Sequence, residues 1–340
     1  MIKYIKRLIK IIKKFIYSFE AKPVVQFKET NTDVTNLFIN SSYKKKKLIY
    51  YIIKRTPGAG LFSNFIYVLN HLKIAYSCGY EPVVDMENFI TIYNERNKVI
   101  DTKNAWNYFF DNKKKLNLNK IYKENKFIIS SNRFSKTFSH KINNNEFRYL
   151  FNKYFKIKNT FINYANDFSK KNFKKKTLAI HLRGTSYKTS ANHPFPTTIK
   201  QTINLVEELI KKYSFEKIFL CTEDLNYFNL IKDKFKNKVI FLNDSYKSFK
   251  DDAFKIYPRK FHRYKLGRDI LLEALLISKC DSFVFTNSNV SEFVKFLDNK
   301  KVINYFSIQN GFNSSNEYMA KWLWYYKDIF PPLLGGFKDK

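Results

Sequence analysis

Residues 177–187 read TLAIHLRGTSY, an apolar run of strand length that ends in a basic and polar turn. The same order recurs downstream, as KIFLCTED at 217–224 and as SFVFTNSNVSEF at 282–293. Amphipathic segments separate these runs. Short apolar strands that alternate with amphipathic helices favour a parallel, doubly wound sheet. Ligands of such sheets bind beyond the carboxyl ends of the strands, so the polar turns are the expected functional sites.

The rest of the chain fits the same pattern. Apolar runs at 48–53 (LIYYII) and 82–85 (PVVD) predict two strands, and the spacing over 61–77 predicts a helix between them. Residues 101–170 are rich in Asn, Lys and aromatic residues and are expected to be mostly helical. In the second half we expect further strands at 239–242 and 301–306, and helices from 198 onward and near 225–236, 267–279 and 291–299. The predicted fold class is therefore α/β, with two doubly wound halves that face a central cleft.

This pattern divides the chain into four parts. We expect a basic amphipathic helix at 1–20, an α/β domain at 48–170, a second α/β domain at 177–310, and a C-terminal helix and tail at 311–340.

Composition excludes several classes of protein. The 340 residues are 44% hydrophobic and 18% aromatic, which excludes a mostly disordered chain. The three cysteines lie far apart, so neither a disulfide framework nor a cysteine zinc site is indicated, and a reducing compartment is expected. The 62 Lys and Arg against 29 Asp and Glu give a net charge of +33, which favours anionic partners. An AT-rich coding bias toward Lys is the alternative explanation of that charge.

The N-terminal segment MIKYIKRLIKIIKKFIY has a more specific pattern. On a helical projection its cations fall on one narrow face, opposite a row of isoleucines. This pattern is typical of a helix that lies on an anionic membrane surface, although a helix packed on the domain would show it too. Lysines interrupt the apolar residues too often for a signal peptide, and no run approaches transmembrane length.

The first polar turn is GAGLFSN, Gly58 to Asn64. Gly58 and Gly60 would let backbone N–H groups approach an anion or a sugar at a helix N-terminus. The motif half-matches the dinucleotide fingerprint, with Asp85 at the end of the next strand. Asn64 could point its amide into the cleft or form a buried hydrogen bond.

Two further turns follow neighbouring strands of the second half. Arg183 offers planar, permanently charged donors that suit a diphosphate, and His181 points to the same side of its strand. A salt-bridged structural Arg and a core His are the alternatives. Thr222, Glu223 and Asp224 could bind a ribose or a basic group, or Asp224 could cap the following helix.

The last turn, TNSN, and one helix complete the candidate site. Ser288, Asn289 and the first helical N–H groups form a natural phosphate nest, unless they are an ordinary N-cap. Glu273 lies in an otherwise apolar helix, where a carboxylate is costly unless it is paired or bound to a ligand. The five histidines show no metal-ligand spacing, so no metal and no cofactor are expected.

HLRGTSYK, CTED and TNSNVSEF, in this order and at these separations, resemble the donor-site motifs of the fucosyltransferase superfamily. That superfamily includes α1,2-, α1,6- and protein O-fucosyltransferases. The segment from GAGLFSN onward and TKNAWNYFF at 102–110 resemble bacterial surface-polysaccharide glycosyltransferases. The resemblance covers about 48–310. It implies a GT-B fold, with 48–170 as the acceptor-side domain and 177–310 as the nucleotide-sugar-binding domain. It also implies metal-independent, inverting transfer from a GDP-sugar, most often GDP-fucose.

The resemblance also implies roles for particular residues. Arg183 corresponds to the catalytic Arg that holds the donor β-phosphate, and His181 and Glu273 to groups that contact the guanosine. The donor diphosphate would be held by Ser288 and Asn289, with Thr222, Glu223 and Asp224 as the acidic turn and Asn64 near the transferred sugar. Gly184 departs from the pattern, because many members have a second Arg there. Some members of the superfamily use a Glu in the long loop after the Arg as the general base, but residues 187–196 contain no carboxylate. Asp85 and Glu87 of the first half are the candidates that remain for this role.

Together these observations predict a bacterial glycosyltransferase with a GDP-sugar donor and a glycan or glycolipid acceptor. It is expected in the cytoplasm, held at the inner face of the cytoplasmic membrane by residues 1–20, with no nucleic-acid partner. Two alternatives remain: a non-catalytic, basic nucleic-acid-binding protein, or an NAD-dependent oxidoreductase built on GAGLFS.

Overall fold

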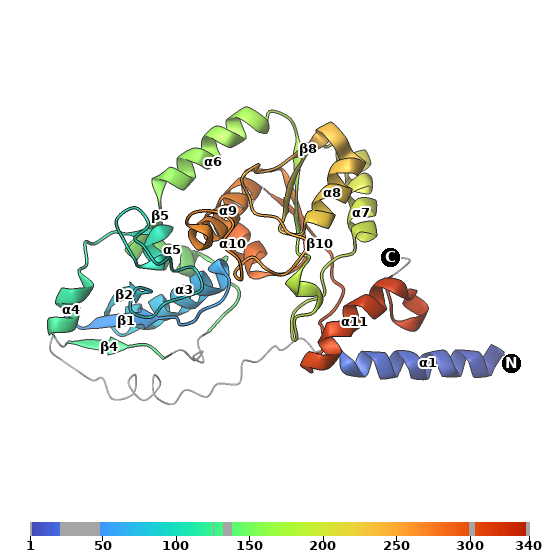
Figure 1. The fold of residues 1–340 in the computed structure, drawn as a ribbon, viewed down its shortest axis with the longest axis horizontal. Helices are drawn as coiled ribbons and strands as arrows, with labels where there is room; N and C mark the ends of the chain where they lie inside the picture. The colour runs from blue at the N-terminus through green and yellow to red at the C-terminus, as the bar shows by residue number, and fades with distance from the viewer. Residues whose placement is uncertain (1, 21–47, 125, 132–137, 299–302, 338–340) are drawn as a thin grey trace.

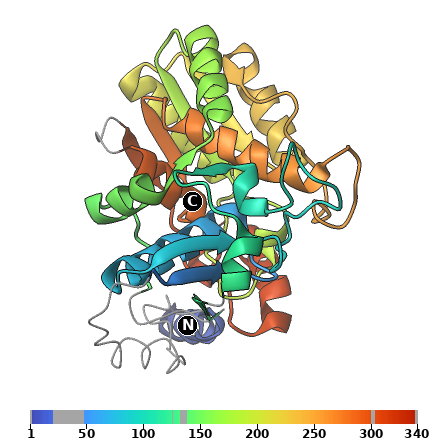
Figure 2. The same cartoon turned by 90° about the vertical axis from the view of Figure 1, so that its left-hand side faces the viewer.

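The computed structural model describes residues 2–20, 48–124, 126–131, 138–298 and 303–337. Two parallel β-sheets, each with its own helices, form the two halves of the body (Figure 1). Seen from the side, the halves lie one above the other (Figure 2). The α/β fold class expected from the sequence is thus confirmed.

The larger sheet contains five parallel strands in the order β10-β9-β6-β7-β8. Their bounds are β6 Thr177–Leu182, β7 Lys217–Thr222, β8 Val239–Ile240, β9 Ser282–Phe285 and β10 Asn304–Ser307. All five agree with the apolar runs expected from the sequence, although residues 301 and 302 of the last run lie outside the described part. The strand order reverses at β6, so consecutive connections run outward from the centre in opposite directions.

Helices cover both faces of this sheet. Their bounds are α7 Ile199–Tyr213, α8 Leu225–Phe235, α9 His262–Ile277 and α10 Asn289–Leu297, with short 3-10 turns η2 at Ser186–Lys188 and η3 at Lys236–Lys238. Alternate strand residues face opposite ways, so Ile180 packs with α7 and α8 whereas Ala179 packs with α9. Thr198 and Gln201 form a reciprocal capping box that fixes the start of α7.

The smaller sheet belongs to the first half and has the order β2-β1-β4. Its strands are β1 Tyr50–Lys54, β2 Glu81–Asp85 and β4 Phe127–Ile129, all parallel. Helix α3, Leu61–Ser77, connects β1 to β2 as expected. It ends just before Gly79, whose φ of +68° is the left-handed conformation that glycine adopts most easily.

The described part of residues 101–170 contains short strands as well as the expected helices. They form helices α4 Leu118–Glu124, α5 Asn145–Tyr154 and α6 Asn159–Asn172, but also the 3-10 turn η1 Ala105–Tyr108 and three short strands. Two of these strands, β3 Phe110–Asn112 and β5 Phe155–Ile157, pair antiparallel, and the third is β4. The expected helices are therefore present, but the three strands were not predicted, because three-residue strands leave no measurable period in a sequence.

The two halves share one apolar core. The Phe62 ring of α3 stacks on the Phe293 ring of α10, with centroids 4.0 Å apart. Gly267 of α9 lies so close to Phe109 that a Cβ there would approach the ring to 2.3 Å. Helix α6 also packs on α9, and its Phe168 contacts Phe219 of β7. Helix α6, which precedes β6 in the sequence, therefore already packs against the half that contains the larger sheet.

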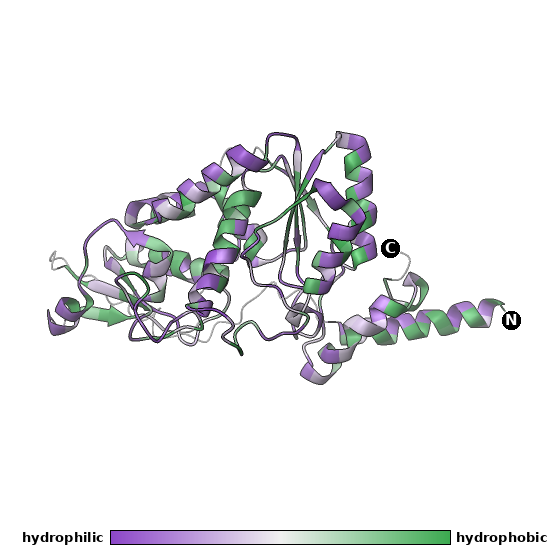
Figure 3. Cartoon of the chain, turned by 45° about the horizontal axis from the view of Figure 1, so that its top comes forward, coloured by the Kyte–Doolittle hydropathy of each residue, from purple (hydrophilic) through white to green (hydrophobic). Residues whose placement is uncertain are grey.

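The terminal helices pack together away from both sheets (Figure 1). They are α1, Ile2–Phe19, and α11, Glu317–Ile329, followed by the 3-10 turn η4 at Pro332–Leu334. Hydrophobic and hydrophilic bands alternate along α1 (Figure 3), as its amphipathic sequence predicts. Each helix in the described part of the chain is too short or too polar to cross a membrane.

Candidate functional site

The candidate site lies where the strand order of the larger sheet reverses. The central strands β6 and β9 are neighbours, and His181 is in register with Phe285. The loop after β6 carries Arg183, and the loop after β9 leads to Ser288. On the other side of β6, Leu182 pairs with Thr222, so the turn after β7 also lies beside Arg183. The topology thus brings the three polar turns to one edge of the sheet, where doubly wound folds bind their ligands.

Arg183 places a positive charge at the carboxyl edge of the larger sheet. Its Nε lies 3.6 Å from Glu223 Oε1, and its guanidinium carbon lies 4.2 Å from the centre of the Tyr187 ring. About a quarter of the side chain is exposed. Burial disfavours its charge, but Glu223 and other anionic groups outweigh this effect and raise the pKa of Arg183 above its ordinary value. The site therefore holds a permanent cation that solvent can still reach.

His181 stands behind Arg183 on the same strand. It is 2% exposed, and its Nδ1 atom has no hydrogen-bond partner among the described residues. Burial and, to a smaller extent, the charge of Arg183 lower the pKa of His181 to about 3. The imidazole is therefore neutral at physiological pH, with one ring nitrogen unsatisfied.

The turn after β7 orders the loop of Arg183. Glu223 Oε1 accepts a hydrogen bond from the Gly184 N–H at 3.2 Å. Asp224 caps α8 by accepting from the N–H groups of Asn226 and Tyr227, and it forms an ion pair with Lys188 at 3.1 Å. The Thr222 hydroxyl accepts from the Asp224 N–H. Asp224 and Thr222 are thus engaged in local structure, the alternative that the sequence had left open for Asp224.

The structure explains the glycine at 184. A Cβ at this position would lie 2.2 Å from Asp224 Oδ2 and 2.4 Å from Asp224 Cβ. No side chain fits there while Asp224 caps α8. The loop therefore carries one arginine rather than two.

The third turn starts helix α10. Ser288 is its N-cap: the side chain accepts from the Ser291 N–H, while the Ser291 hydroxyl accepts from the Ser288 N–H. Ser288 and Asn289 are both half-buried. This N-cap was the alternative to a phosphate nest, but the two are compatible, because the first N–H groups of a capped helix still carry a partial positive charge.

Glu273 lies in α9 and is 7% exposed. Burial raises its pKa to about 8, and Asp269 adds to the shift, whereas Lys247 and Arg183 oppose it. The loop before α9 supplies charged neighbours that the sequence did not single out. Arg259 pairs with Asp269 at 2.5 Å. Burial lowers the pKa of Lys247, although Glu273 opposes the shift. Lysines are so common in this chain that Lys247 carried no distinguishing signal.

The GAG turn after β1 is held closed by Asn64. The Asn64 amide accepts from the Ala59 N–H at 2.9 Å and donates to the Ala59 carbonyl at 3.1 Å. Gly58 has a φ of +74°, and a Cβ there would press on the Asn64 side chain. Gly60 caps α3 and has open space around it. Asn64 therefore makes the buried hydrogen bonds that the sequence offered as its alternative role.

One residue connects this turn to Arg183. The Tyr93 hydroxyl accepts from the Leu61 N–H at 2.8 Å. Burial raises the pKa of Tyr93 to about 12, while Arg183 is close enough to lower it by its charge. The N-terminus of α3 thus reaches the candidate site through Tyr93, which the sequence analysis had missed.

Asp85 does not meet the needs of a dinucleotide site or of a general base. It is fully buried and accepts four hydrogen bonds, from the N–H groups of Glu87 and Asn88, the Asn88 amide and the Tyr122 hydroxyl. Its lone pairs are occupied, so it has little capacity left for a ribose or an acceptor proton.

Two other features bear on possible ligands. The described residues include no group of three or more His, Cys, Asp or Glu side chains that could hold a metal ion.

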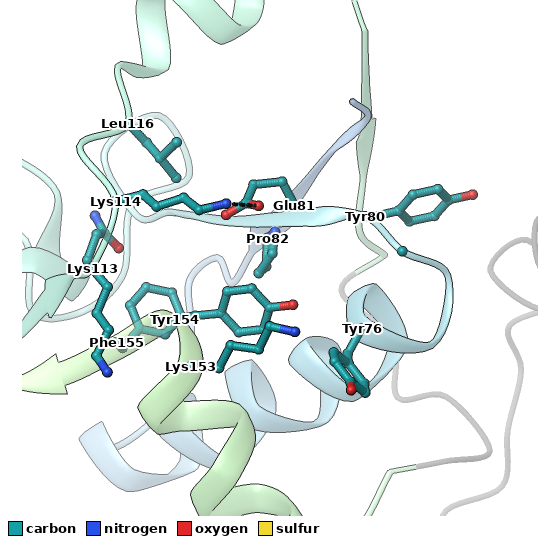
Figure 4. Close-up of a pocket in the computed structure, with 12 residues that line it drawn as sticks. Tyr76, Tyr80, Glu81, Pro82, Lys113, Lys114, Leu116, Lys153, Tyr154 and Phe155 are labelled. Carbon is teal, nitrogen blue, oxygen red and sulfur yellow. Dashed lines mark hydrogen bonds and ion pairs between the residues drawn. The ribbon is translucent and has the colours of Figure 1, made fainter. Parts of the chain in front are cut away.

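A cavity of about 390 Å³ opens at the amino end of β2, beside Lys114, Lys153 and Tyr154 (Figure 4). Lys114 pairs with Glu81 and Lys153 lies over the Tyr76 ring, so both cations already have partners. This amino end of the smaller sheet is opposite to the GAG turn, which follows the carboxyl end of β1.

Comparison with known proteins gives matches only at the level of structure. No family model matches the sequence, and no curated protein matches it significantly. A NodZ α-1,6-fucosyltransferase soaked with GDP-fucose is similar at 14% identity and a TM-score of 0.49, over 74% of this chain and 93% of that chain. The fucosyltransferase NodZ from Bradyrhizobium is similar at 13% identity and a TM-score of 0.47, over 76% of this chain and 94% of that chain. POFUT1 in complex with GDP is similar at 10% identity and a TM-score of 0.43, over 78% of this chain and 100% of that chain. These are fucosyltransferase structures.

Proposed function

We propose that this protein is a glycosyltransferase that moves fucose or a related sugar from a GDP-sugar to a cell-surface glycan precursor. The observation that carries the proposal is the position of Arg183. It lies at the point where the strand order reverses, beside the turn that begins α10. A permanent cation and a helix N-terminus at one edge of a parallel sheet suit a diphosphate. The resemblance of the three turns to donor-site motifs supports the same function.

Each turn receives a role in donor binding. Arg183 holds the β-phosphate, and Ser288, Asn289 and the first N–H groups of α10 hold the remaining phosphate oxygens. Glu223 orders the Arg183 loop through its bond to Gly184. His181 and Glu273 contact the guanosine. The unsatisfied Nδ1 of His181 and the buried carboxyl of Glu273 are polar groups that a nucleoside would satisfy.

The reaction displaces GDP from the anomeric carbon. An acceptor hydroxyl attacks that carbon from the face opposite to GDP, so a new C–O bond forms with inversion. The bond to the β-phosphate breaks, its electron pair stays on GDP, and the hydroxyl proton passes to a base. Arg183 and the α10 N–H groups stabilise the charge that develops on the phosphate, which is the largest effect that such a site supplies. These groups take the place that a divalent cation holds in metal-dependent transferases.

We also propose that the enzyme works at the inner face of the cytoplasmic membrane, attached through α1. The helix carries six cations at 3, 6, 7, 10, 13 and 14 and no carboxylate. Such a helix is attracted to anionic lipid and buries its apolar face at the headgroup boundary. A lipid-linked or membrane-proximal glycan is the acceptor that this location favours.

The donor is tested by thermal shift with GDP, UDP, CDP, ADP and NAD, on the wild type and on Arg183→Ala and Arg183→Lys. Binding to the native state raises the melting temperature by mass action, so GDP at a hundred times its Kd should add about 2.7 kcal/mol of stability. We expect a shift with GDP alone, lost in Arg183→Ala and weakened in Arg183→Lys, which keeps the charge without the planar fork. Arg96→Ala, at an exposed arginine, is the matched control.

Other outcomes would overturn the assignment. A preference for UDP would change the donor, and a preference for NAD would favour an oxidoreductase. If no nucleotide shifts the melting temperature while single-stranded oligonucleotides bind with steep salt dependence, the nucleic-acid alternative would replace the enzyme. Transfer from GDP-fucose should persist in EDTA, whereas strict metal dependence would contradict the mechanism.

A further inference from the structure

Helix α11 exposes a narrow apolar stripe. Tyr318, Trp322, Tyr325 and Ile329 are 78, 74, 46 and 63% exposed. Their spacing of four, three and four residues places them on one face of the helix. The opposite face is buried against the body through Ala320, Leu323, Trp324 and Lys327. Contacts within the protein therefore account for one side of α11, and a row of large side chains faces solvent on the other.

Helix α1 presents a second stripe with the same spacing. Tyr4, Leu8, Ile11 and Phe15 are all more than half exposed. Its other apolar positions turn inward near the C-terminal end, where Ile16 is 8% exposed and Ile12 is partly buried. On a helical projection the six cations lie to one side of this row, with Arg7 and Lys14 nearest to it and Lys6 and Lys13 on the opposite side of the helix. The terminal helices thus contribute two apolar stripes, one of them bordered by positive charge.

The two helices are joined to each other. Ile16 packs in one cluster with Leu323, Trp324 and Phe337. Lys327, 2% exposed, forms an ion pair with Glu20 and donates to the Gly335 carbonyl at 2.7 Å. A buried ion pair of this kind fixes geometry, because each charge would be left unpaired if the other moved away. The position of α1 therefore sets the position of α11.

We propose that α11 is a second membrane-binding element, which inserts its stripe into an anionic lipid surface alongside α1. Tyr and Trp are the side chains that prefer the headgroup region, since each has an apolar body and a polar group. An apolar chain such as Ile329 adds buried area below that level. The inference rests on the membrane attachment proposed for α1 and is independent of the sugar transferred.

Charge selects lipid as the occupant over a second copy of this chain. Pairing two such surfaces would bring two α1 helices together, each with six cations and no carboxylate. Like charges at short range repel, and the whole chain carries +33. An anionic bilayer neutralises the same charges. The cationic helix α1 and the aromatic stripe of α11 therefore fit an anionic bilayer better than they fit a second copy of the same surface.

Tryptophan fluorescence provides a direct test, because only one of the three tryptophans is exposed. Trp322 is 74% exposed, whereas Trp106 and Trp324 are 2 and 5% exposed. The full chain is mixed with vesicles of phosphatidylcholine and phosphatidylglycerol in which the phosphatidylcholine acyl chains are brominated. Insertion of α11 brings Trp322 next to the bromines, so we expect quenching and a blue shift in these vesicles and not in pure phosphatidylcholine. Trp322→Phe should still bind and should lose the quenching.

A second variant separates insertion from folding. Replacing Tyr318, Trp322 and Ile329 with Ser should lower the vesicle partition coefficient about tenfold or more, while the GDP-induced thermal shift stays unchanged. The same number of changes at exposed aromatic residues of the body, Tyr149, Tyr164 and Phe249, should leave partitioning unaffected. Vesicle binding without quenching would show that α1 binds alone and would overturn the proposal. Self-association without vesicles that the Ser variant abolishes would assign the stripe to a second copy.

Discussion

Single residues at the site limit what the loops can accept. Gly184 is the clearest case, since Asp224 occupies the space that any side chain there would need. We expect Gly184→Ala to lower the free energy of unfolding by about 1–3 kcal/mol, the usual cost of overpacking. It should also weaken GDP binding, because the loop of Arg183 must move.

Denaturant unfolding measures the stability effect of Gly184→Ala. Gly60→Ala is the matched control: Gly60 has a φ of −55°, and a methyl group added there would meet no atom within 4 Å, so the stability of this variant should be unchanged. Equal stability of the two variants would mean that Asp224 gives way at little cost.

The protonation of Glu273 predicts a pH dependence of stability. Its folded pKa of about 8 lies above its ordinary value of 4.5. The unfolded chain therefore loses this proton first as the pH rises, and the native state is progressively destabilised between about pH 4.5 and 8. Glu273→Gln removes this effect, so the variant should gain up to ~1.4 kcal/mol on the wild type for each pH unit within that window.

Urea unfolding at several pH values tests this prediction. The difference in stability between Glu273→Gln and the wild type should be constant below pH 4.5 and above pH 8. A difference that does not change from pH 5 to pH 8 would show that Glu273 is ionised in the folded protein.

Among the elements, helix α8 begins at Asp224, a residue of the candidate site that also stabilises the local structure. Asp224 caps α8 and pairs with Lys188. Asp224→Asn keeps a capping oxygen, whereas Asp224→Ala removes it and should cost about 1 kcal/mol. If Asp224 acts only through structure, the Asn variant should retain the GDP-induced thermal shift. Loss of that shift in a stable Asn variant would indicate that the carboxylate itself binds the donor.

Elements differ in how far the sequence predicts them. The strands β6, β7 and β9 are buried on both faces, so each appears as an apolar run with clear ends. The strands β3, β4 and β5 have three residues each and are stabilised by partners elsewhere in the chain, which local patterning does not reveal. The same limit applies to the site. His181 lies in β6 and Arg183 directly follows that strand, so both could be predicted, whereas Tyr93 and Lys247 reach the site from loops.

At the scale of the molecule, the shared core predicts that the two halves unfold together. Phe62 and Phe293 stack across the boundary, and apolar residues of both sheets belong to one cluster. We expect a single calorimetric transition, and Phe293→Ala should lower the stability by about 3–5 kcal/mol. Two separate transitions in the wild type, with only the later half responding to GDP, would show that the halves are independent.

The ion pair between Glu20 and Lys327 has a consequence for biosynthesis. It joins the first helix to almost the last segment of the chain, so α1 leaves the ribosome long before its docking site exists. Throughout translation the nascent protein therefore exposes its entire apolar helix face beside six cations. For the membrane attachment proposed above, this order of synthesis means that a bilayer would meet α1 before α11 is made. A truncation that removes α11 would consequently leave α1 without its packing partner.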